Sequence, residues 1–124
     1  MKKVEAVIPH ARMQTAFSAL RELDLGGLTY YESKGRGEIS TPVIHGGRGN
    51  SVFRPEFNVN VTISIVVRDP VANDVVGKIL ESTSTGLAGE GKIFISEIDD
   101  AVDIGSGERG DAAIWWNQLK DEIM

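Results

Sequence analysis

The chain has 124 residues, 41% of them hydrophobic, and no cysteine, so we expect one domain with an ordinary core and neither disulfides nor thiolate metal sites. Its formal net charge of −5 argues against nucleic acid as a partner, because phosphate binding needs clustered lysine and arginine. No segment approaches the ~20 apolar residues that cross a bilayer, and Glu5 interrupts the apolar run near the N-terminus, so we expect a cytoplasmic protein that does not insert into membranes.

The first half of the chain predicts a strand, a helix and a second strand. The apolar run at 4–8 ends at a proline and predicts the first strand. Apolar residues between 11 and 25 recur with i, i+3, i+4 and i+7 spacing, which predicts an amphipathic helix that Gly26 and Gly27 terminate. Residues 28–33 are rich in strand formers and predict the second strand. The predicted buried stripe of the helix consists of Met13, Ala16, Phe17, Leu20 and Leu23.

A long segment, 35–58, follows the second predicted strand and is rich in glycine, proline, serine and charged residues. A loop of this length inside a compact domain is uncommon, and such loops are usually functional or disordered. We therefore interpret 35–58 as the first feature of the chain that indicates a function.

The second half of the chain again predicts a strand, a helix and a strand. Residues 59–67 alternate with a period of two, which predicts a strand. Asp69 suits the N-cap and Pro70 the first position of a helix that should end at 85–86. A glycine-rich turn then precedes the last predicted strand, at 92–96. The predicted buried stripe of this helix consists of Val71, Val75, Val76, Ile79 and Leu80.

This order of elements is that of the ferredoxin-like split unit, an α+β fold in which two helices cover one face of a four-stranded antiparallel sheet. Valine, isoleucine and phenylalanine occur on both sides of the first, third and fourth predicted strands. We therefore expect the open face to be apolar and covered by another subunit in a closed, symmetric oligomer.

Residues 86–92 spell G-x-x-x-x-G-K, which is most of a P-loop. Nucleotide hydrolysis is nevertheless not expected here, because Ile93 stands where serine or threonine would hold magnesium and because the loop follows a helix and precedes a strand. The glycines can bring backbone N–H groups close to an anion, and Lys92 adds a positive charge. An anion-binding loop and a plain helix-to-strand turn both stay open. A second glycine-rich segment, 105–111, taken alone predicts a flexible surface turn.

Three segments together resemble the PII signal-transduction proteins. Residues 34–37 read K-G-R-G, residues 85–94 are similar to the family's B-loop T-G-x-x-G-D-G-K-I-F, and residues 105–113 are similar to its C-loop T-G-E-x-G-x-x-A. The resemblance implies one PII-like domain at 1–114, followed by a C-terminal extension at 115–124. Within that domain it implies a T-loop at about 35–58, a B-loop at 85–92 and a C-loop at 103–111.

The resemblance implies a homotrimer with a ligand site in each of three clefts between subunits, usually for ATP or ADP, and a role in nitrogen regulation. It implies that the T-loop docks onto a partner, such as a membrane transporter or an enzyme, and changes with the ligand. We expect no catalytic residue and no metal ligand. The residues assigned to the ligand site are Gly27, Leu28, Thr29, Gly35, Arg36, Gly37, Ser64, Gly86, Gly89, Glu90, Gly91 and Lys92. Those expected to meet the partner are His45, Arg48, Ser51 and Arg54.

Several positions depart from the family's pattern on the phosphate side of the site. The T-loop glutamine that helps to hold magnesium and 2-oxoglutarate is Ile39 here, and the basic residue before it is Glu38. The family's R-x-R ahead of the C-loop reads D-I-G at 103–105, and the lysine after T-G is Leu87. Charge-assisted bonds are worth about 1.5–3 kcal/mol each. We therefore expect an adenine nucleotide or a related small effector. AMP, ADP, a cyclic nucleotide or a different small molecule is favoured over ATP with magnesium and 2-oxoglutarate.

Two other functions stay open: an enzyme in the cleft, with slow nucleotide hydrolysis or chemistry by Glu38, His45 or Glu108, and a trimeric scaffold that binds no ligand. We see no nucleophile and base at a recognisable spacing. Two tryptophans at 115–116 precede a predicted short helix, and we interpret them as core or interface packing. The alternative is a tail that caps the ligand cleft or binds a partner.

Overall fold

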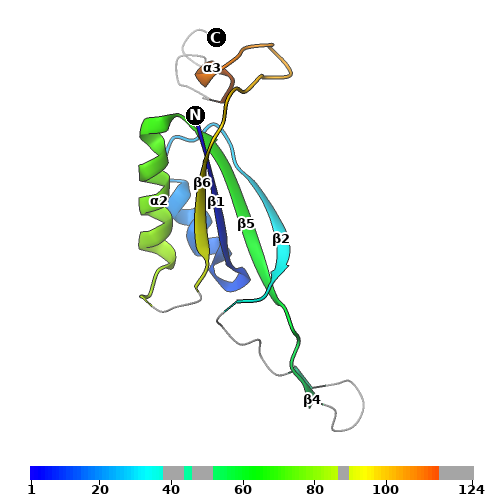
Figure 1. Cartoon of the computed structure of the whole chain (residues 1–124). Coiled ribbons are helices and arrows are strands. Elements are labelled where there is room, and N and C mark those ends of the chain that lie inside the picture. The colour runs from blue at the N-terminus through cyan, green and yellow to red at the C-terminus, as the bar shows by residue number, and fades with distance from the viewer. Residues whose placement is uncertain (38–43, 46–51, 87–89, 115–124) are drawn as a thin grey trace.

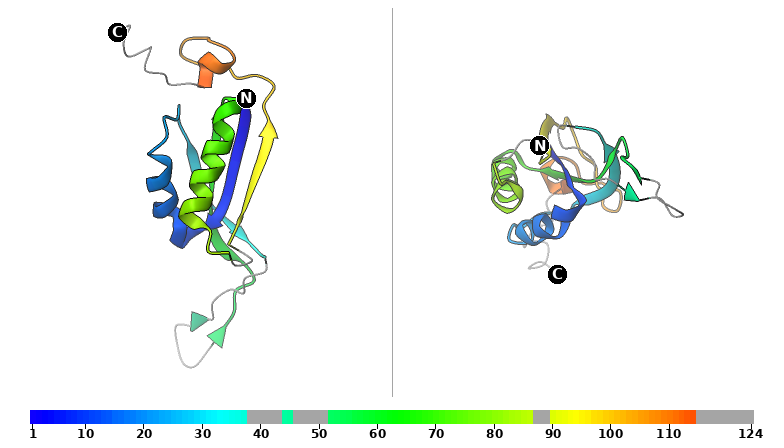
Figure 2. Two further views of the ribbon diagram at one scale, coloured as in Figure 1. Left: turned by 90° about the vertical axis from the view of Figure 1, so that its left-hand side faces the viewer. Right: turned by 90° about the horizontal axis from the view of Figure 1, so that it is seen from below.

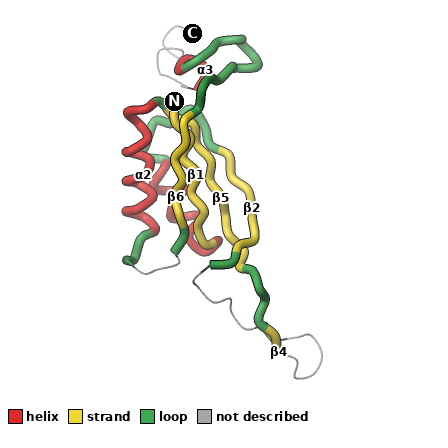
Figure 3. Tube along the Cα trace, viewed as in Figure 1, coloured by secondary structure: helices red, strands yellow, loops and turns green. Residues whose placement is uncertain are grey.

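The computed structural model describes residues 1–37, 44–45, 52–86 and 90–114. Its main sheet has the spatial strand order β2-β5-β1-β6, and every neighbouring pair is antiparallel (Figures 1 and 3). This order confirms the predicted ferredoxin-like sheet. The four strands are β1 (Lys2–Pro9), β2 (Thr29–Gly35), β5 (Asn58–Val67) and β6 (Lys92–Glu97).

The helices lie side by side on one face of the sheet (Figures 1 and 2). They are α1 (Met13–Leu20), which follows the short 3-10 helix η1 (His10–Arg12), and α2 (Asp69–Thr83). The predicted arrangement, with helices on a single face, is therefore confirmed. Within the described ranges, none of the helices is long and apolar enough to cross a membrane.

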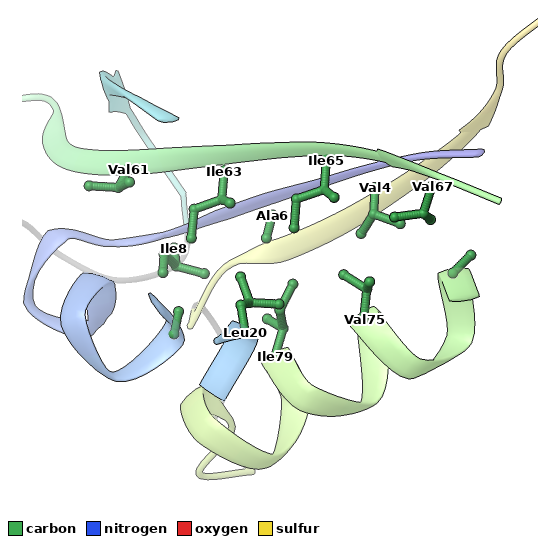
Figure 4. Close-up of a cluster of buried hydrophobic side chains, with 12 residues drawn as sticks. Val4, Ala6, Ile8, Leu20, Val61, Ile63, Ile65, Val67, Val75 and Ile79 are labelled. Atoms are coloured by element: carbon green, nitrogen blue, oxygen red, sulfur yellow. The ribbon is translucent and has the colours of Figure 1, made fainter. Parts of the chain in front are cut away.

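The core lies between the sheet and these helices and follows the period of two in β1 and β5 (Figure 4). Antiparallel pairing places Val4 opposite Ile65, so that buried residues of both strands point to the same face. Each fully buried aliphatic side chain of this kind stabilises the fold by about 1.5–3 kcal/mol. The buried apolar residues are Val4, Ala6, Ile8, Ala16, Leu20, Val61, Ile63, Ile65, Val67, Ala72, Val75 and Ile79.

The predicted C-terminal end of the first helix, at 25, is wrong, because α1 ends at Leu20. Beyond that residue the amide of Glu22 bonds to the carbonyl of Ala19, and the amide of Leu23 bonds to the carbonyl of Leu20. These i to i−3 bonds tighten the chain, and they leave Leu23 and Leu25 packed against the core. The buried stripe of the helix is confirmed.

Helix α2 differs from the prediction at both ends. Its N-cap is Arg68, and Asp69 is the first helical residue, where a carboxylate meets the positive end of the helix dipole. The helix ends at Thr83 instead of at 85–86. Leu80, predicted to be buried, is 50% exposed. Ala72, which was not predicted to be buried, belongs to the core.

The open face of the sheet is not the apolar surface that the sequence analysis predicts. Most valines and isoleucines of β1 and β5 point toward the helices, and the open face carries polar neighbours such as Lys3 and Glu5, whose charged groups lie 2.6 Å apart. The hydrogen bond that Lys3 donates to the carboxylate of Glu5 raises the pKa of Lys3. Thr62 is buried on this face beside the hydroxyl of Ser33, with 3.3 Å between the two oxygens. Apolar groups remain there at Val7, Val66 and Phe94.

The segment 35–58 contains a short two-stranded ladder, in which β3 (Ile44–His45) pairs with β4 (Val52–Phe53). At the opposite end of the sheet lie the residues after β6 and the short helix α3 (Asp111–Ile114) (Figures 1 and 2). The glycine-rich segment there forms an exposed turn that is closed by backbone hydrogen bonds. Val102 pairs with Arg109, and the amide of Asp103 donates to the carbonyl of Glu108 at 2.8 Å.

Replacing Gly91 by alanine should destabilise the fold. Gly91 has a φ of +126°, and a Cβ there would lie 2.1 Å from the carbonyl oxygen of Val7. Both the loop backbone and β1 would have to move, so we expect a loss of about 1–3 kcal/mol, measured by thermal unfolding at fixed protein concentration. Gly77→Ala is the control, because Gly77 lies inside α2 with open space at its Cβ position and alanine should stabilise by about 0.5–1 kcal/mol. An unchanged midpoint for Gly91→Ala would contradict the close contact.

The carboxyl of Asp100 should titrate below its ordinary value of 3.8. The hydrogen bond from Arg109, at 2.8 Å, is the main cause of the lowered pKa, and the amide of Ala101 adds to it. Because the folded pKa lies below the unfolded one, the pair stabilises the hairpin above about pH 3.8 and loses this effect as the pH falls through the lowered pKa. Titration by carbon NMR should show Arg109→Gln moving the pKa of Asp100 upward, whereas Arg36→Gln should leave it in place. An Asp100 pKa that does not respond to Arg109→Gln would refute the pairing.

Candidate ligand-binding site

A pocket of about 360 Å³ lies on the open face, at the end of the sheet from which the segment 35–58 leaves. Antiparallel order brings the last residues of β1 and β2 to the same edge as the first residues of β5 and β6. The pocket is therefore built by four strand ends that are far apart in the sequence. Its lining residues are Val7, Pro9, Gly35, Arg36, Gly37, Asn58, Asn60, Gly91, Lys92 and Phe94.

Half of these residues are predicted site residues: 35–37 of the T-loop region, and Gly91 and Lys92 of the B-loop region. The pocket thus brings the two predicted loops together. The other half of the lining residues were not predicted from the sequence. Phe94 could have been found from Lys92, since residues two apart on a strand share a face. Asn58 and Asn60 share that alternation, but their place beside the pocket depends on strand pairing. Val7 and Pro9 line the pocket only because β1 lies between β5 and β6 in the sheet.

Gly35 permits a close packing at the pocket wall. A Cβ at this position would lie 2.6 Å from the side-chain nitrogen of Asn60. The amide side chain of Asn60 therefore lies directly against the backbone where the chain leaves β2. Any side chain at position 35 would push Asn60 away and reshape the pocket.

Two cationic side chains, Arg36 and Lys92, line the pocket, and one of them is already in an ion pair. The guanidinium of Arg36 pairs with the carboxylate of Glu56, with 2.7 Å between Nη1 and Oε1, and both side chains are exposed. Lys92 is exposed as well and forms no ion pair with any other residue that the structure describes. An anion in the pocket would therefore meet Lys92 directly and would compete with Glu56 for Arg36.

Four predicted ligand residues lie away from this pocket. Gly27 and Leu28 line a separate groove beside α1. Thr29 pairs with Ser64 at the start of β2. Six steps of strand separate Thr29 from Gly35, which is about 20 Å at ~3.3 Å per residue. A single chain thus holds the predicted site as two separate groups.

The ends of the B-loop are joined by Glu90. Its two carboxylate oxygens accept the amide hydrogen of Thr85, at 3.0 and 2.8 Å. The side chain of Glu90, a predicted ligand residue, is therefore bound to the backbone at the other end of the B-loop. Gly86 follows with a φ of +84°, a left-handed conformation that favours glycine. Gly89 and Leu87 lie outside the described residues.

The remaining predicted residues are only partly placed. His45 belongs to β3, and Arg54 is exposed shortly before β5. Arg48, Ser51, Glu38 and Ile39, together with the tryptophans and the predicted helix after residue 114, lie outside the described residues. No group of three or more histidines and acidic residues in the described part of the chain could hold a metal ion. Two acidic residues at and just after the end of β6 are in ion pairs: Glu97 with Lys2 and Asp100 with Arg109.

Comparisons with known proteins identify the family of the chain. The model of the family described as "Nitrogen regulatory protein P-II" matches residues 1–108. The nitrogen regulatory protein P-II of Rhodospirillum rubrum is 35% identical over 92% of this chain and all of the relative. That of Bradyrhizobium diazoefficiens is 36% identical, and P-II 1 of Escherichia coli is 34% identical, both with the same coverage. A match of this length and identity shows that the chain belongs to the nitrogen regulatory protein P-II family.

Proposed function

We propose that this chain is a homotrimeric signalling protein that binds an adenine nucleotide on its open face and regulates a protein partner through the segment 35–58. The observation that carries the proposal is the pocket in which Gly35, Arg36 and Gly37 meet Gly91 and Lys92. The base of the long loop and the glycine-rich loop thus share one ligand-sized space. The partner would be a transporter or an enzyme, and the chain itself would be no enzyme.

The separation of the predicted ligand residues supports a site between subunits. Thr29 and Ser64 lie about 20 Å from Gly35 along the same open face. One mononucleotide would not span that length, but a second copy could present its Thr29 side to the pocket of the first. Exposed apolar groups, such as Phe94 at 55% and Ile104 at 102%, give such a copy surfaces to cover.

The charge distribution supports a ligand with few phosphates. Lys92 is the cation that faces the pocket without a described ion-pair partner, and Arg36 is already held by Glu56. In the C-loop, Asp103 accepts the amide hydrogen of Ser106 at 3.0 Å, and Ile104 is fully exposed. Neither side chain can supply the cation that a triphosphate needs. We therefore propose AMP, ADP or a cyclic nucleotide as the effector.

The ion pair of Arg36 and Glu56 offers a route from ligand to loop. Arg36 stands where the chain enters the long loop, and Glu56 stands where it returns to β5. The pair thus joins the two ends of the loop. A phosphate that draws Arg36 into the pocket would release Glu56 and change the constraint on the loop, which is an order–disorder type of switch.

Calorimetry of the purified protein against ATP, ADP, AMP and cyclic AMP tests the proposal, with and without magnesium and 2-oxoglutarate. We expect AMP, ADP or cyclic AMP to bind at least as tightly as ATP, with one site per chain and no gain from magnesium. Light scattering should give three times the chain mass. Clearly tighter binding of ATP would refute the ligand class, and the absence of any nucleotide binding would refute the site. Steady nucleotide turnover in the same samples would favour an enzyme.

Removing the carboxylate that holds Arg36 should tighten nucleotide binding. Exposed ion pairs are worth about 0.2–1 kcal/mol, so freeing Arg36 by Glu56→Gln should lower Kd by about 1.4- to 5-fold. Lys92→Gln should raise Kd by about tenfold or more, because it removes a charge-assisted bond. Glu22→Gln is the control, since Glu22 pairs with Lys78 on the helical side. Weaker binding by Glu56→Gln would contradict the competition.

A further inference from the structure

An apolar groove lies between α1 and β2, on the helical side of the protein and away from the pocket described above. Its volume is about 350 Å³, within the range of about 300–1000 Å³ that is typical of sites for small organic groups. Leu28 and Tyr30 line it and are 41% and 52% exposed. The ring of Tyr30 packs edge-on against Phe17, with 5.1 Å between centroids. We call this surface the α1–β2 groove; the rest of its lining is Leu20, Arg21, Leu23, Leu25 and Gly27.

The described chain ends next to this groove. Ile114, at the end of α3, lines a smaller pocket together with Leu25, and Leu25 also lines the α1–β2 groove. The pocket that Ile114 lines and the α1–β2 groove therefore share Leu25. The next two residues in the sequence are Trp115 and Trp116, and the chain has no other tryptophan.

We propose that the tail beginning at Trp115 docks in the α1–β2 groove of its own chain, with an indole ring as the anchor. Each residue of chain reaches up to about 3.3–3.6 Å, so both tryptophans can reach past Leu25. An indole buries a large apolar area and leaves its N–H free to meet a polar rim. Arg21, exposed at the edge of the groove, offers a cation to the face of that ring.

This docking goes beyond the proposed signalling function. The family model ends at residue 108, so the tail is outside the part of the chain that it matches. The groove also contains Gly27 and Leu28, which the sequence analysis assigns to the ligand site. The tail therefore lies beside the half of the site that a neighbouring copy would use. The tests below measure docking without any nucleotide, so their outcome is independent of that of the calorimetry.

Tryptophan fluorescence reports on this tail alone, because both tryptophans are in it. We expect the native full-length protein to emit at a shorter wavelength than the unfolded chain and to resist quenching by acrylamide. Leu28→Asp should shift the emission toward that of the unfolded chain and increase quenching. Leu80→Asp is the matched control, since Leu80 is comparably exposed, at 50% against 41% for Leu28, but lies on α2 outside the groove. Native emission like that of the unfolded chain would overturn the proposal, and so would equal spectra for the two variants.

A second measurement decides the matter if Leu28→Asp alters folding or assembly. The chain has no cysteine, so a single introduced cysteine can carry a nitroxide, which quenches tryptophan at short range. A nitroxide at Arg21→Cys should quench the fluorescence strongly, and one at Glu81→Cys, exposed on α2, should quench it weakly. Equal quenching from both positions would place the tryptophans elsewhere and overturn the docking.

Discussion

The antiparallel pairing of β1 with β5 and β6 is the constraint on which the rest of the structure depends. It places Val4 opposite both Ile65 and Ile95 and gives one face of the sheet to the helices. A slip of one residue would turn every buried side chain of β1 toward the open face. The same register brings Gly91 against the backbone of Val7, where a larger residue has no room. Core and pocket are therefore fixed by one set of strand pairs.

The pocket follows from that pairing more than from any local motif. In an antiparallel sheet of this order the loop between β2 and β5 and the loop before β6 must leave from the same edge. Arg36 and Lys92 thus line the same pocket although they are 56 positions apart in the chain. The ion pair of Arg36 with Glu56 joins the two ends of the long loop at this place. The pocket and the closure of the long loop therefore share one charged side chain, Arg36.

The predicted ligand residues of one chain do not lie together in one place. Within one chain the open face is polar at its centre, and the two groups of predicted ligand residues lie at opposite ends of β2. In the homotrimer that we propose, unlike edges of neighbouring copies would meet and bring these two groups together. The hydrogen-bonded hairpin at 101–110 holds its exposed apolar residues in a defined position for such a contact.

The sequence alone determined the order of elements, the helix stripe at Ala16 and Leu20, the alternation of β5 and the loop motifs that resemble PII proteins, because these depend on residues close together in the chain. It could not place the end of α1, since Leu23 satisfies the helical period but packs against the core from outside the helix. It could not show that Glu56 neutralises Arg36, that Glu90 holds Thr85, or that Asn60 and Phe94 face the pocket. These facts were decided only by the tertiary structure, because each depends on which strand ends meet, and strand pairing joins residues that no local pattern connects.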